Sequence, residues 1–327
     1  MPHNPLRILV VDDEPTNLKV MQNVLADTYQ LSFAKSGQAA LKLADEQVPN
    51  LILLDVMMPE MSGIEVCKAL KNNPNTQHIP VIFVTALSDN NDEFQGFEVG
   101  AVDYIIKPIT PALVRARVRT HLSLVQAEQL KKAHVDLVQR LGAAAEYKDE
   151  DTGEHILRMS RYSKALALAH GINEDDAEII RQAAPMHDVG KIGIPDAILL
   201  KPGKLTHSEF DKIKEHTTIG GKILENSDSP LLRLAHKLAM EHHEKWDGSG
   251  YPYGLQGEQI SIEARIVTLA DVFDALTSKR PYKEAWPTDQ AFEYIAEQAG
   301  KHFDPVLTAT FLGIKTQLLD IKQRYNR

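Results

Sequence analysis

Cysteine is almost absent from this sequence. Its 327 residues include a single cysteine, Cys67, which excludes an intrachain disulfide and favours a reducing compartment. No apolar run approaches the roughly 20 residues that a membrane span requires, and the first residues lack the charged and apolar regions of a secretion signal. We therefore expect a cytoplasmic protein with no membrane insertion.

Basic residues are outnumbered by acidic ones. The net charge is −9, and no basic run is longer than the pair Lys131-Lys132, so we expect no DNA binding. An anionic substrate would then have to be attracted by a local cationic centre. With a prior of roughly 100–200 residues per domain, the chain length suits two domains.

Short apolar runs alternate with amphipathic stretches in the first third of the chain. Residues 8–11, 51–54, 81–84 and 104–106 have the composition of buried parallel strands. Residues 39–46 and 63–71, between them, have helical spacing. The pattern predicts a doubly wound α/β sheet, in which a site lies outside the carboxyl ends of the strands.

Chemically active residues directly follow these runs. They are Asp12, Asp13, Asp55, Thr85 and Lys107. Carboxylates gathered at one edge repel one another unless a hard cation lies among them, and Mg²⁺ prefers such oxygen ligands. Phosphorylation of Asp55 would add about two negative charges, which Lys107 and Thr85 are suited to contact.

Residues 1 to about 120 resemble the receiver domain of two-component response regulators. The matching positions are Asp12-Asp13, Asp55, Thr85-Ala86 and Lys107-Pro108. The resemblance implies that Asp55 is the phosphoacceptor, that the acids hold Mg²⁺, and that the Lys107-Pro108 bond is cis. It also implies a cognate histidine kinase as partner.

A connector follows the receiver-like part. After Pro111 the sequence runs without glycine or proline to Leu141, which predicts a long helix. Leu130, Leu137 and Ala144 recur every seven residues, which fits a short coiled-coil seam and a homodimer. A helix that packs on its own second domain fits equally well, and the sequence leaves both interpretations open.

The rest of the chain has helical periodicity. Apolar residues recur at helical spacing in residues 156–169, 177–184, 231–240, 264–276 and 291–299. We predict an all-α bundle, and bundle cores are places where facing helices assemble metal sites. The predicted divisions are a receiver domain at 1–124, a helical connector at 125–149 and a metal-dependent phosphohydrolase domain at 150–327.

Metal-ligating residue types gather in this bundle. Neighbouring helical residues point about 100° apart, so one cation cannot easily take both members of His187-Asp188 or of His242-His243, and we expect two ions. The predicted ligands are His155, His187, Asp188, His216, His242, His243 and Asp271. Mixed histidine and carboxylate ligation suits Fe, Mn, Ni or Zn, and the sequence does not choose among them.

Asp151 has two interpretations. It stands four residues before His155 and would share its helix face, as a ligand of a third ion. It also fits the N-cap of a capping box completed by Glu154, and we favour the cap.

Residues from about 140 to 315 resemble the HD-GYP subfamily of HD-domain phosphohydrolases. The matches are residues 187–196, the His216 segment, His242-His243 and Gly250-Tyr251-Pro252. The resemblance implies hydrolysis of cyclic di-GMP to linear pGpG, with further cleavage to GMP left open. Ser261 departs from it, since a proline is expected there.

Catalytic and substrate contacts follow from the same residues. Asp188 would bridge the two ions, and Lys191 would hold developing charge on the phosphoryl oxygens. The predicted substrate contacts are Lys191, Gly250, Tyr251, Pro252 and Arg280. The tyrosine would stack on a base, and the arginine would hold a phosphate.

Two rival functions are compatible with parts of this pattern. An HD hydrolase of another nucleotide, such as a different cyclic dinucleotide or a guanosine polyphosphate, would leave the Gly250-Tyr251-Pro252 loop unexplained. A non-catalytic cyclic di-GMP receptor would predict missing ligands, and none of the core motif positions is lost.

Overall fold

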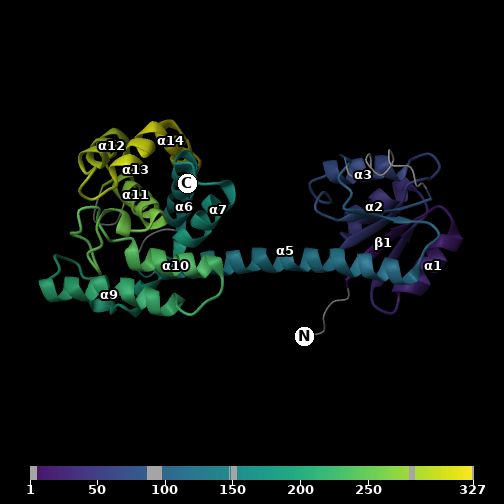
Figure 1. The fold of residues 1–327 in the computed structure, drawn as a ribbon, viewed down its shortest axis with the longest axis horizontal. Helices are drawn as coiled ribbons and strands as arrows, with labels where there is room; N and C mark the ends of the chain where they lie inside the picture. Colours follow the sequence, from purple (N-terminus) through teal and green to yellow (C-terminus); the bar gives the residue numbers. More distant parts are fainter. Residues whose placement is uncertain (1–5, 87–97, 147, 149–152, 280–283, 326–327) are drawn as a thin grey trace. The chain divides into compact units, whose positions relative to one another are not determined.

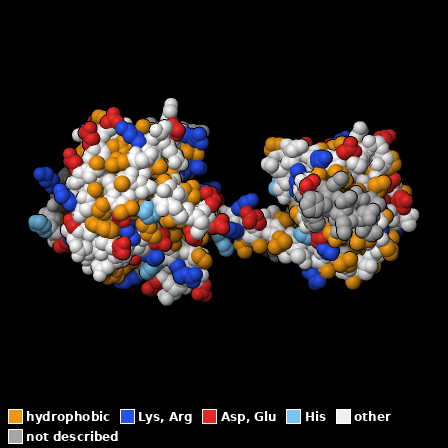
Figure 2. All heavy atoms as spheres, turned by 45° about the horizontal axis from the view of Figure 1, so that its top comes forward, with side chains coloured by type: hydrophobic (Ala, Val, Ile, Leu, Met, Phe, Trp, Pro, Cys, Tyr) orange, Lys and Arg blue, Asp and Glu red, His pale blue; other side chains and the backbone are white. Residues whose placement is uncertain are grey.

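The computed structural model describes residues 6–86, 98–146, 148, 153–279 and 284–325. The chain divides into two compact units between Lys131 and Lys132, and Figure 1 shows the elements of each. Asp151 and Arg280, which the sequence analysis singled out, lie outside the described residues. On the face shown in Figure 2, acidic, basic and apolar side chains are interspersed over each unit.

A parallel sheet of five strands forms the centre of the first unit. Its order is β2-β1-β3-β4-β5, and all four pairings are parallel. This is a doubly wound order with its switch point between β1 and β3, which confirms the predicted fold class. The strands are β1 (Arg7–Val11), β2 (Gln30–Ala34), β3 (Leu51–Asp55), β4 (Val81–Thr85) and β5 (Asp103–Ile106).

Helices cover both faces of this sheet. Alternate strand residues point to opposite faces: Leu9, Ile52 and Phe83 contribute to one apolar cluster, whereas Val10 and Leu53 contribute to the other. The edge strand β2 contains polar residues and was not located from the sequence. The helices of this unit are α1 (Pro15–Leu25), α2 (Gly37–Gln47), α3 (Gly63–Asn72) and the first part of α5 (Pro111–Glu146).

Helix α5 buries one side of its second half and exposes another. Val138 and Ala145 are buried in the core of the second unit, whereas Leu130, Leu137 and Leu141 are 58, 55 and 47% exposed. The packing of this helix on the second unit is therefore observed, whereas the coiled-coil seam stays a prediction. One face packs on the second unit, and the leucine stripe remains solvent-exposed.

The second unit is helical, as predicted. One apolar cluster forms its core. Within it, the ring centroid of Phe273 lies 5.3 Å from that of Tyr162, 4.9 Å from that of Phe292 and 5.3 Å from that of Phe311. No helix in the described parts of the chain is both long and apolar enough to cross a bilayer. The α-helices are α6 (Gly153–Ala169), α7 (Glu174–Ala183), α8 (Asp196–Leu199), α9 (His207–Leu224), α10 (Pro230–Glu241), α11 (Ile262–Thr277), α12 (Thr288–Glu297), α13 (Pro305–Gly313) and α14 (Lys315–Arg324).

Short 3₁₀ helices also occur among the described residues of this unit. They are η2 (Ala184–Met186), η3 (Val189–Gly193) and η4 (Gly257–Gln259). Ser261, which departs from the family pattern, is the N-cap of α11, and its side chain accepts a hydrogen bond from the Ala264 N–H at 3.4 Å.

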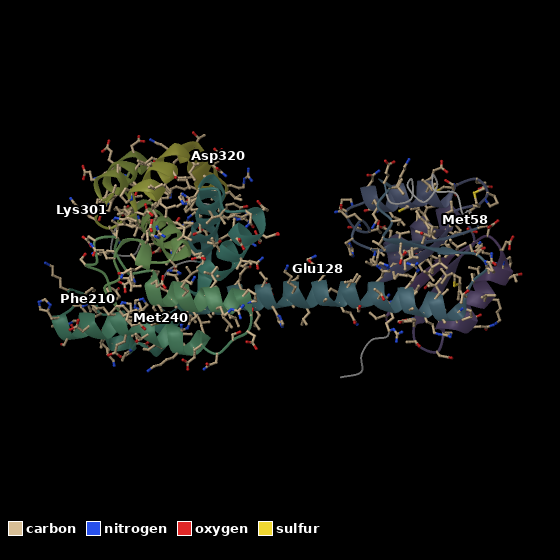
Figure 3. All side chains as sticks on the ribbon, in the orientation of Figure 1. Met58, Glu128, Phe210, Met240, Lys301 and Asp320 are labelled. Atoms are coloured by element: carbon tan, nitrogen blue, oxygen red, sulfur yellow. The ribbon has the colours of Figure 1, made fainter. Side chains whose placement is uncertain are left out.

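Close packing places η3 directly on α9. A Cβ atom added at Gly190 would lie 1.8 Å from the carbonyl oxygen of His216, so only glycine permits this approach. Helices α9 and α10 lie side by side, and Figure 3 marks Phe210 on the first and Met240 on the second. The segment around Asp188 is thereby brought against the histidine-bearing helices.

Candidate metal centre

The seven predicted ligands that the structure describes lie in two groups within the second unit. Within each group, ligand atoms lie no more than 4.8 Å apart. The first group is Asp188, His216, His242 and His243, and the second is His155, His187 and Asp271. They come from α6, the turn between η2 and η3, α9, the end of α10, and α11.

Asp188 joins the two groups. Its Oδ1 atom is 3.2 Å from Nε2 of His216 and 3.3 Å from Nε2 of His242. Its Oδ2 atom is 3.2 Å from Nε2 of His187, in the second group. The Nζ atom of Lys191 stands 2.8 Å from the same Oδ2 atom. One buried carboxylate thus contacts imidazoles of both groups and an ammonium.

The hydrogen bonds of two imidazoles determine which ring nitrogen carries the proton. Nδ1 of His216 and Nδ1 of His242 donate to backbone carbonyl oxygens at 2.7 and 3.0 Å. A carbonyl oxygen only accepts, so in the neutral rings each Nε2 atom carries a lone pair. These two Nε2 atoms are 3.3 Å apart and both face Asp188. A cation placed among these lone pairs would relieve their mutual repulsion.

Burial favours the protonation states that bind metal. It lowers the pKa of His242, and it holds the pKa of His243 well below the ordinary value with His242 as the next cause. At Asp188, burial opposes ionisation, but Lys191 and His187 hold the pKa well below its usual range. Neutral imidazoles and an ionised carboxylate are the forms that coordinate ions.

His242 and His243 do not divide between the two groups, contrary to the prediction from helical spacing. Both residues belong to one group, and their ring centroids are 4.1 Å apart. Helix α10 ends at Glu241, so His243 is released from the 100° helical step. His187 and Asp188 do divide between the two groups, in the turn that joins η2 to η3.

A buried carboxylate that the sequence analysis missed supports His155. Nδ1 of His155 lies 2.8 Å from Asp274 Oδ2, and its Nε2 lies 3.4 Å from Asp271 Oδ1. Nε of Arg158 donates to Asp274 Oδ1 at 2.8 Å. Burial raises the pKa of Asp274, but hydrogen bonds from His155 and Arg158 lower it to about 2. Such a carboxylate orients the ring toward an ion, and its position three residues after Asp271 was the available signal.

The Gly250-Tyr251-Pro252 loop folds back on the end of α10. The Tyr251 N–H donates to the His243 carbonyl oxygen at 3.2 Å, and a Cβ atom added at Gly250 would lie 2.4 Å from the Lys245 nitrogen. The Tyr251 ring stacks on the His243 ring with centroids 4.7 Å apart. The loop therefore covers one face of a predicted ligand.

Glu244 anchors the next part of this loop. Its side chain is buried, and its carboxylate accepts from the N–H groups of Tyr253 at 2.7 Å and Leu255 at 3.0 Å. Two charge-assisted hydrogen bonds tie the loop to the residue after the histidine pair. The sequence analysis missed Glu244 because its partners are backbone groups, which carry no residue signature.

Three carboxylates meet at the carboxyl edge of the sheet in the first unit. Oxygen atoms of Asp12, Asp13 and Asp55 lie within 4.8 Å of one another. Nζ of Lys107 is 3.0 Å from Asp12 Oδ2 and 2.8 Å from Asp55 Oδ2, and the peptide bond after Lys107 is cis. Burial raises the pKa of Asp55, with the hydrogen bond from Lys107 opposing it. Thr85 is buried at the end of β4.

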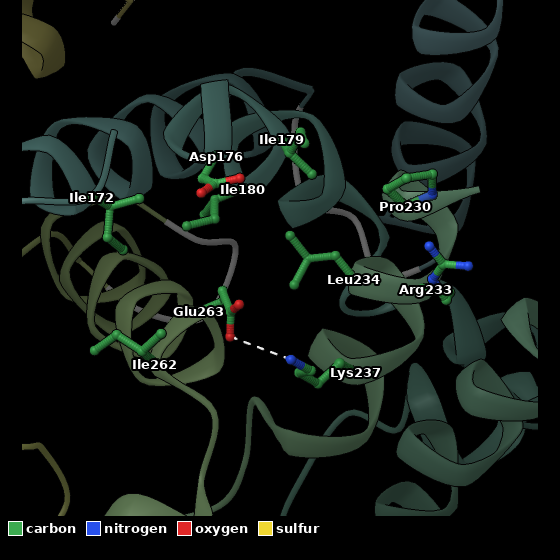
Figure 4. A pocket seen from close by; sticks show the side chains of 10 residues that line it. All are labelled: Ile172, Asp176, Ile179, Ile180, Pro230, Arg233, Leu234, Lys237, Ile262 and Glu263. Carbon is green, nitrogen blue, oxygen red and sulfur yellow. Dashed lines mark ion pairs between the residues drawn. The ribbon is translucent and has the colours of Figure 1, made fainter. Parts of the chain in front are cut away.

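Two cavities lie apart from the histidine groups. One, of about 530 Å³, is lined by residues of α7, α10 and α11 and contains the Lys237–Glu263 ion pair at 3.5 Å (Figure 4). The other, of about 930 Å³, shares Arg233 and Lys237 with it and reaches Tyr253. Neither lining includes a predicted ligand among the described residues.

Two family models match this chain. The HD domain model matches residues 130–307, and the response regulator receiver domain model matches residues 8–119. Both units are therefore similar to known domains in the order in which the sequence analysis expected them.

The chain is also similar to proteins that are named as cyclic dinucleotide phosphodiesterases, one of them a response regulator. A probable cyclic di-GMP phosphodiesterase of Vibrio cholerae is 41% identical over 351 residues, covering 97% of this chain and 80% of its own. The cyclic di-GMP phosphodiesterase response regulator RpfG of Xanthomonas campestris is 39% identical over 338 residues, covering 97% and 89%. A 3′3′-cGAMP-specific phosphodiesterase 2 of Vibrio cholerae is 45% identical over 183 residues, covering 56% and 35%.

We predict that Glu244→Ala releases the loop. Hydrogen bonds to a charged group contribute about 1.5–3 kcal/mol, so the amides of Tyr253 and Leu255 should exchange with deuterium at least roughly tenfold faster. Glu241→Ala is the matched control, because Glu241 accepts from the Ser261 N–H at 2.8 Å on the same helix end. Unchanged exchange at residues 253 and 255 in Glu244→Ala would contradict the anchoring role.

Proposed function

The chain belongs to the HD-domain proteins that carry a response regulator receiver domain, and on this premise we propose that it hydrolyses cyclic di-GMP under the control of phosphorylation at Asp55. The expected product is linear pGpG, with GMP as a further product. The observation that carries the proposal is the convergence of imidazole lone pairs on the Asp188 carboxylate.

Two divalent transition-metal ions, drawn from Fe, Mn, Ni and Zn, would be held by the two ligand groups. Asp188, His216, His242 and His243 would hold one, and His155, His187 and Asp271 the other, with Asp188 shared. The donor set of imidazole nitrogens and carboxylate oxygens fits such ions. Asp151 is the candidate ligand of a third ion and lies outside the described residues.

A metal pair in such a site supplies Lewis acidity and a water of lowered pKa. The chain's own residues supply position and charge. Asp188 lies between imidazoles of both groups, and Asp274 orients the ring of His155. Lys191, 2.8 Å from Asp188, is placed to neutralise charge that develops on a phosphoryl oxygen.

Substrate contacts would come from the loop above the ligands. Tyr251 stacks on His243, and its ring lies 5.8 Å from Nζ of Lys214 on α9. We propose that Gly250, Tyr251 and Pro252 contact a guanine base and that Lys191 contacts a phosphate. Arg280, proposed as a second phosphate contact, lies outside the described residues.

A second candidate substrate is 3′3′-cGAMP. The specific observation that favours it is the 45% identity to a phosphodiesterase named for that nucleotide. The two full-length relatives described above carry cyclic di-GMP in their names and cover 97% of this chain, which is why cyclic di-GMP is placed first.

Control would begin in the receiver domain, which we assign to residues 1–124, followed by the connector at 125–149 and the catalytic domain at 150–327. A histidine kinase would phosphorylate Asp55 with Mg²⁺ held by Asp12 and Asp13. The added charge would compete for Lys107, which contacts both Asp12 and Asp55, and would draw in Thr85.

A homodimer would form through α5. Leu130, His134, Leu137, Leu141 and Ala144 alternate at spacings of four and three residues and are all exposed, which is the pattern of a two-stranded coiled coil. We propose that a second copy of this chain covers the stripe.

We predict that purified protein supplied with Fe, Mn, Ni or Zn converts cyclic di-GMP to pGpG and that Asp188→Asn lowers turnover by roughly a hundredfold or more. Removing the shared carboxylate should also lower the metal content. Product chromatography and elemental analysis measure both effects. Asp320→Asn, at an exposed position of α14, is the control and should behave as wild type.

Parallel incubations with cyclic di-GMP and 3′3′-cGAMP distinguish the two substrates. Cyclic di-GMP left intact with every one of these metals would refute the proposed activity. Faster cleavage of 3′3′-cGAMP would transfer the assignment to the second candidate.

We predict that Asp55→Asn abolishes labelling by acetyl phosphate and makes turnover independent of it, while basal turnover stays within about twofold of wild type. The reason is that the phosphoacceptor is lost, whereas the catalytic unit is unaltered. Asp27→Asn, which alters an exposed acid of the receiver domain, should remain labelled. Labelling of Asp55→Asn equal to wild type would show that the assignment is wrong.

We predict that Leu137→Glu reduces the sedimentation mass from dimer to monomer, because the stripe would acquire two like charges in contact. Asp136→Lys, which lies off the stripe, should leave the dimer intact. A wild-type protein that sediments as a monomer at all concentrations would contradict the proposed dimer.

A further inference from the structure

The end of α5 packs directly on the segment that carries Asp188 and Lys191, which we call the catalytic segment (residues 185–196). A Cβ atom added at Gly142 would lie 2.3 Å from the carbonyl oxygen of Pro185, so the helix backbone and the segment are in direct contact. Ala145 is buried in the same apolar cluster as residues of η2 and η3. The helix therefore forms part of the wall behind the site.

Lys148 binds the other end of the catalytic segment. Its Nζ atom donates to the carbonyl oxygens of Lys191 at 3.3 Å, Ile192 at 3.0 Å and Ile194 at 2.6 Å. It also lies 3.2 Å from a carboxylate oxygen of Asp196. These carbonyl groups lie at the end of η3, and that of Lys191 also accepts a hydrogen bond from the Ile194 N–H at 3.0 Å. One ammonium with three donors satisfies them together.

The contacts of Lys148 help to set the backbone position of Lys191. Lys191 lies within η3, and its Nζ atom is 2.8 Å from Asp188 Oδ2. With its own carbonyl oxygen bound by Lys148, a shift of Lys148 would move the backbone that carries Lys191. Gly142 of α5 contacts one end of this segment, and Lys148, two residues after the last residue of α5, contacts the other end.

We propose that Lys148 is a positioning residue that couples α5 to the catalytic segment, so that a rotation or shift of α5 caused by phosphorylation of the receiver domain alters the placement of Lys191 and Asp188 and thereby the turnover. This inference rests on the proposed function. Its physical basis is a continuous set of contacts from a single helix to the site, and the helix α5 begins in the receiver unit at Pro111 and continues to Glu146.

The test uses the full chain with Lys148→Met, which keeps most of the side-chain volume and removes the ammonium. Lys148→Arg is the conservative variant. Lys164→Met is the matched control, because the side chain of Lys164 is 24% exposed and bound to Glu174 and Glu178, against 26% for Lys148. Lys164 lies on α6, and its ion pairs are with α7 and not with residues 191–196.

In Lys148→Met we expect kcat for cyclic di-GMP to fall about tenfold or more, as for a displaced catalytic group, with KM changed by less than about threefold. The ratio of turnover with and without acetyl phosphate should approach one. Lys148→Arg should restore part of the ratio, and Lys164→Met should retain both kcat and the ratio. The coupling would be overturned if Lys148→Met kept the same ratio as the wild-type protein. It would also be overturned if the ratio in the wild-type protein were one.

Hydrogen–deuterium exchange of residues 189–196 separates this inference from the proposed activity, since it needs no substrate. We expect acetyl phosphate to change the exchange of these residues in wild type and in Lys164→Met. In Lys148→Met we expect exchange to be faster than in wild type and independent of acetyl phosphate. If this pattern appears without any nucleotide hydrolysis, the proposed function fails and the coupling stands. Exchange in Lys148→Met that matches wild type would refute the coupling even in an active enzyme.

Discussion

The candidate metal site depends on electrostatic repulsion among groups that converge at one point in the second unit. Nε2 atoms of His216 and His242 and the Oδ1 atom of Asp188 converge with their lone pairs facing one another. Burial lowers the pKa of His242 and so favours its neutral form, and Lys191 helps to hold the pKa of Asp188 below its usual range. Such a cluster is unfavourable by itself and becomes favourable around cations. The surrounding helices are arranged to hold these groups together against that repulsion.

Interruptions of regular structure place several of the groups. Asp188 lies in a turn between two 3₁₀ helices, and α10 ends just before His242-His243. Continuous helices would have separated neighbouring side chains by about 100°, whereas these breaks direct them inward. Gly190 permits η3 to lie against the His216 backbone. The buried Glu244 carboxylate then folds the following loop over the ligands.

The same segment is reached from the receiver side by a single helix. Gly142 and Lys148 contact opposite ends of residues 185–196, and Lys191 lies between them. Phosphorylation at Asp55 would alter charge in one unit, and the packed end of α5 is the proposed means by which that change would affect the other.

The sequence by itself determined the two fold classes, because apolar periodicity and residue types are local properties that survive without coordinates. It also supplied the identities of the residues that gather in the two ligand groups. Tertiary structure alone decided the roles of Asp274, Glu244 and Lys148, whose partners are distant residues or backbone carbonyl and amide groups without a sequence signature. It also decided that His242 and His243 share one group, because where a helix ends depends on the packing around it.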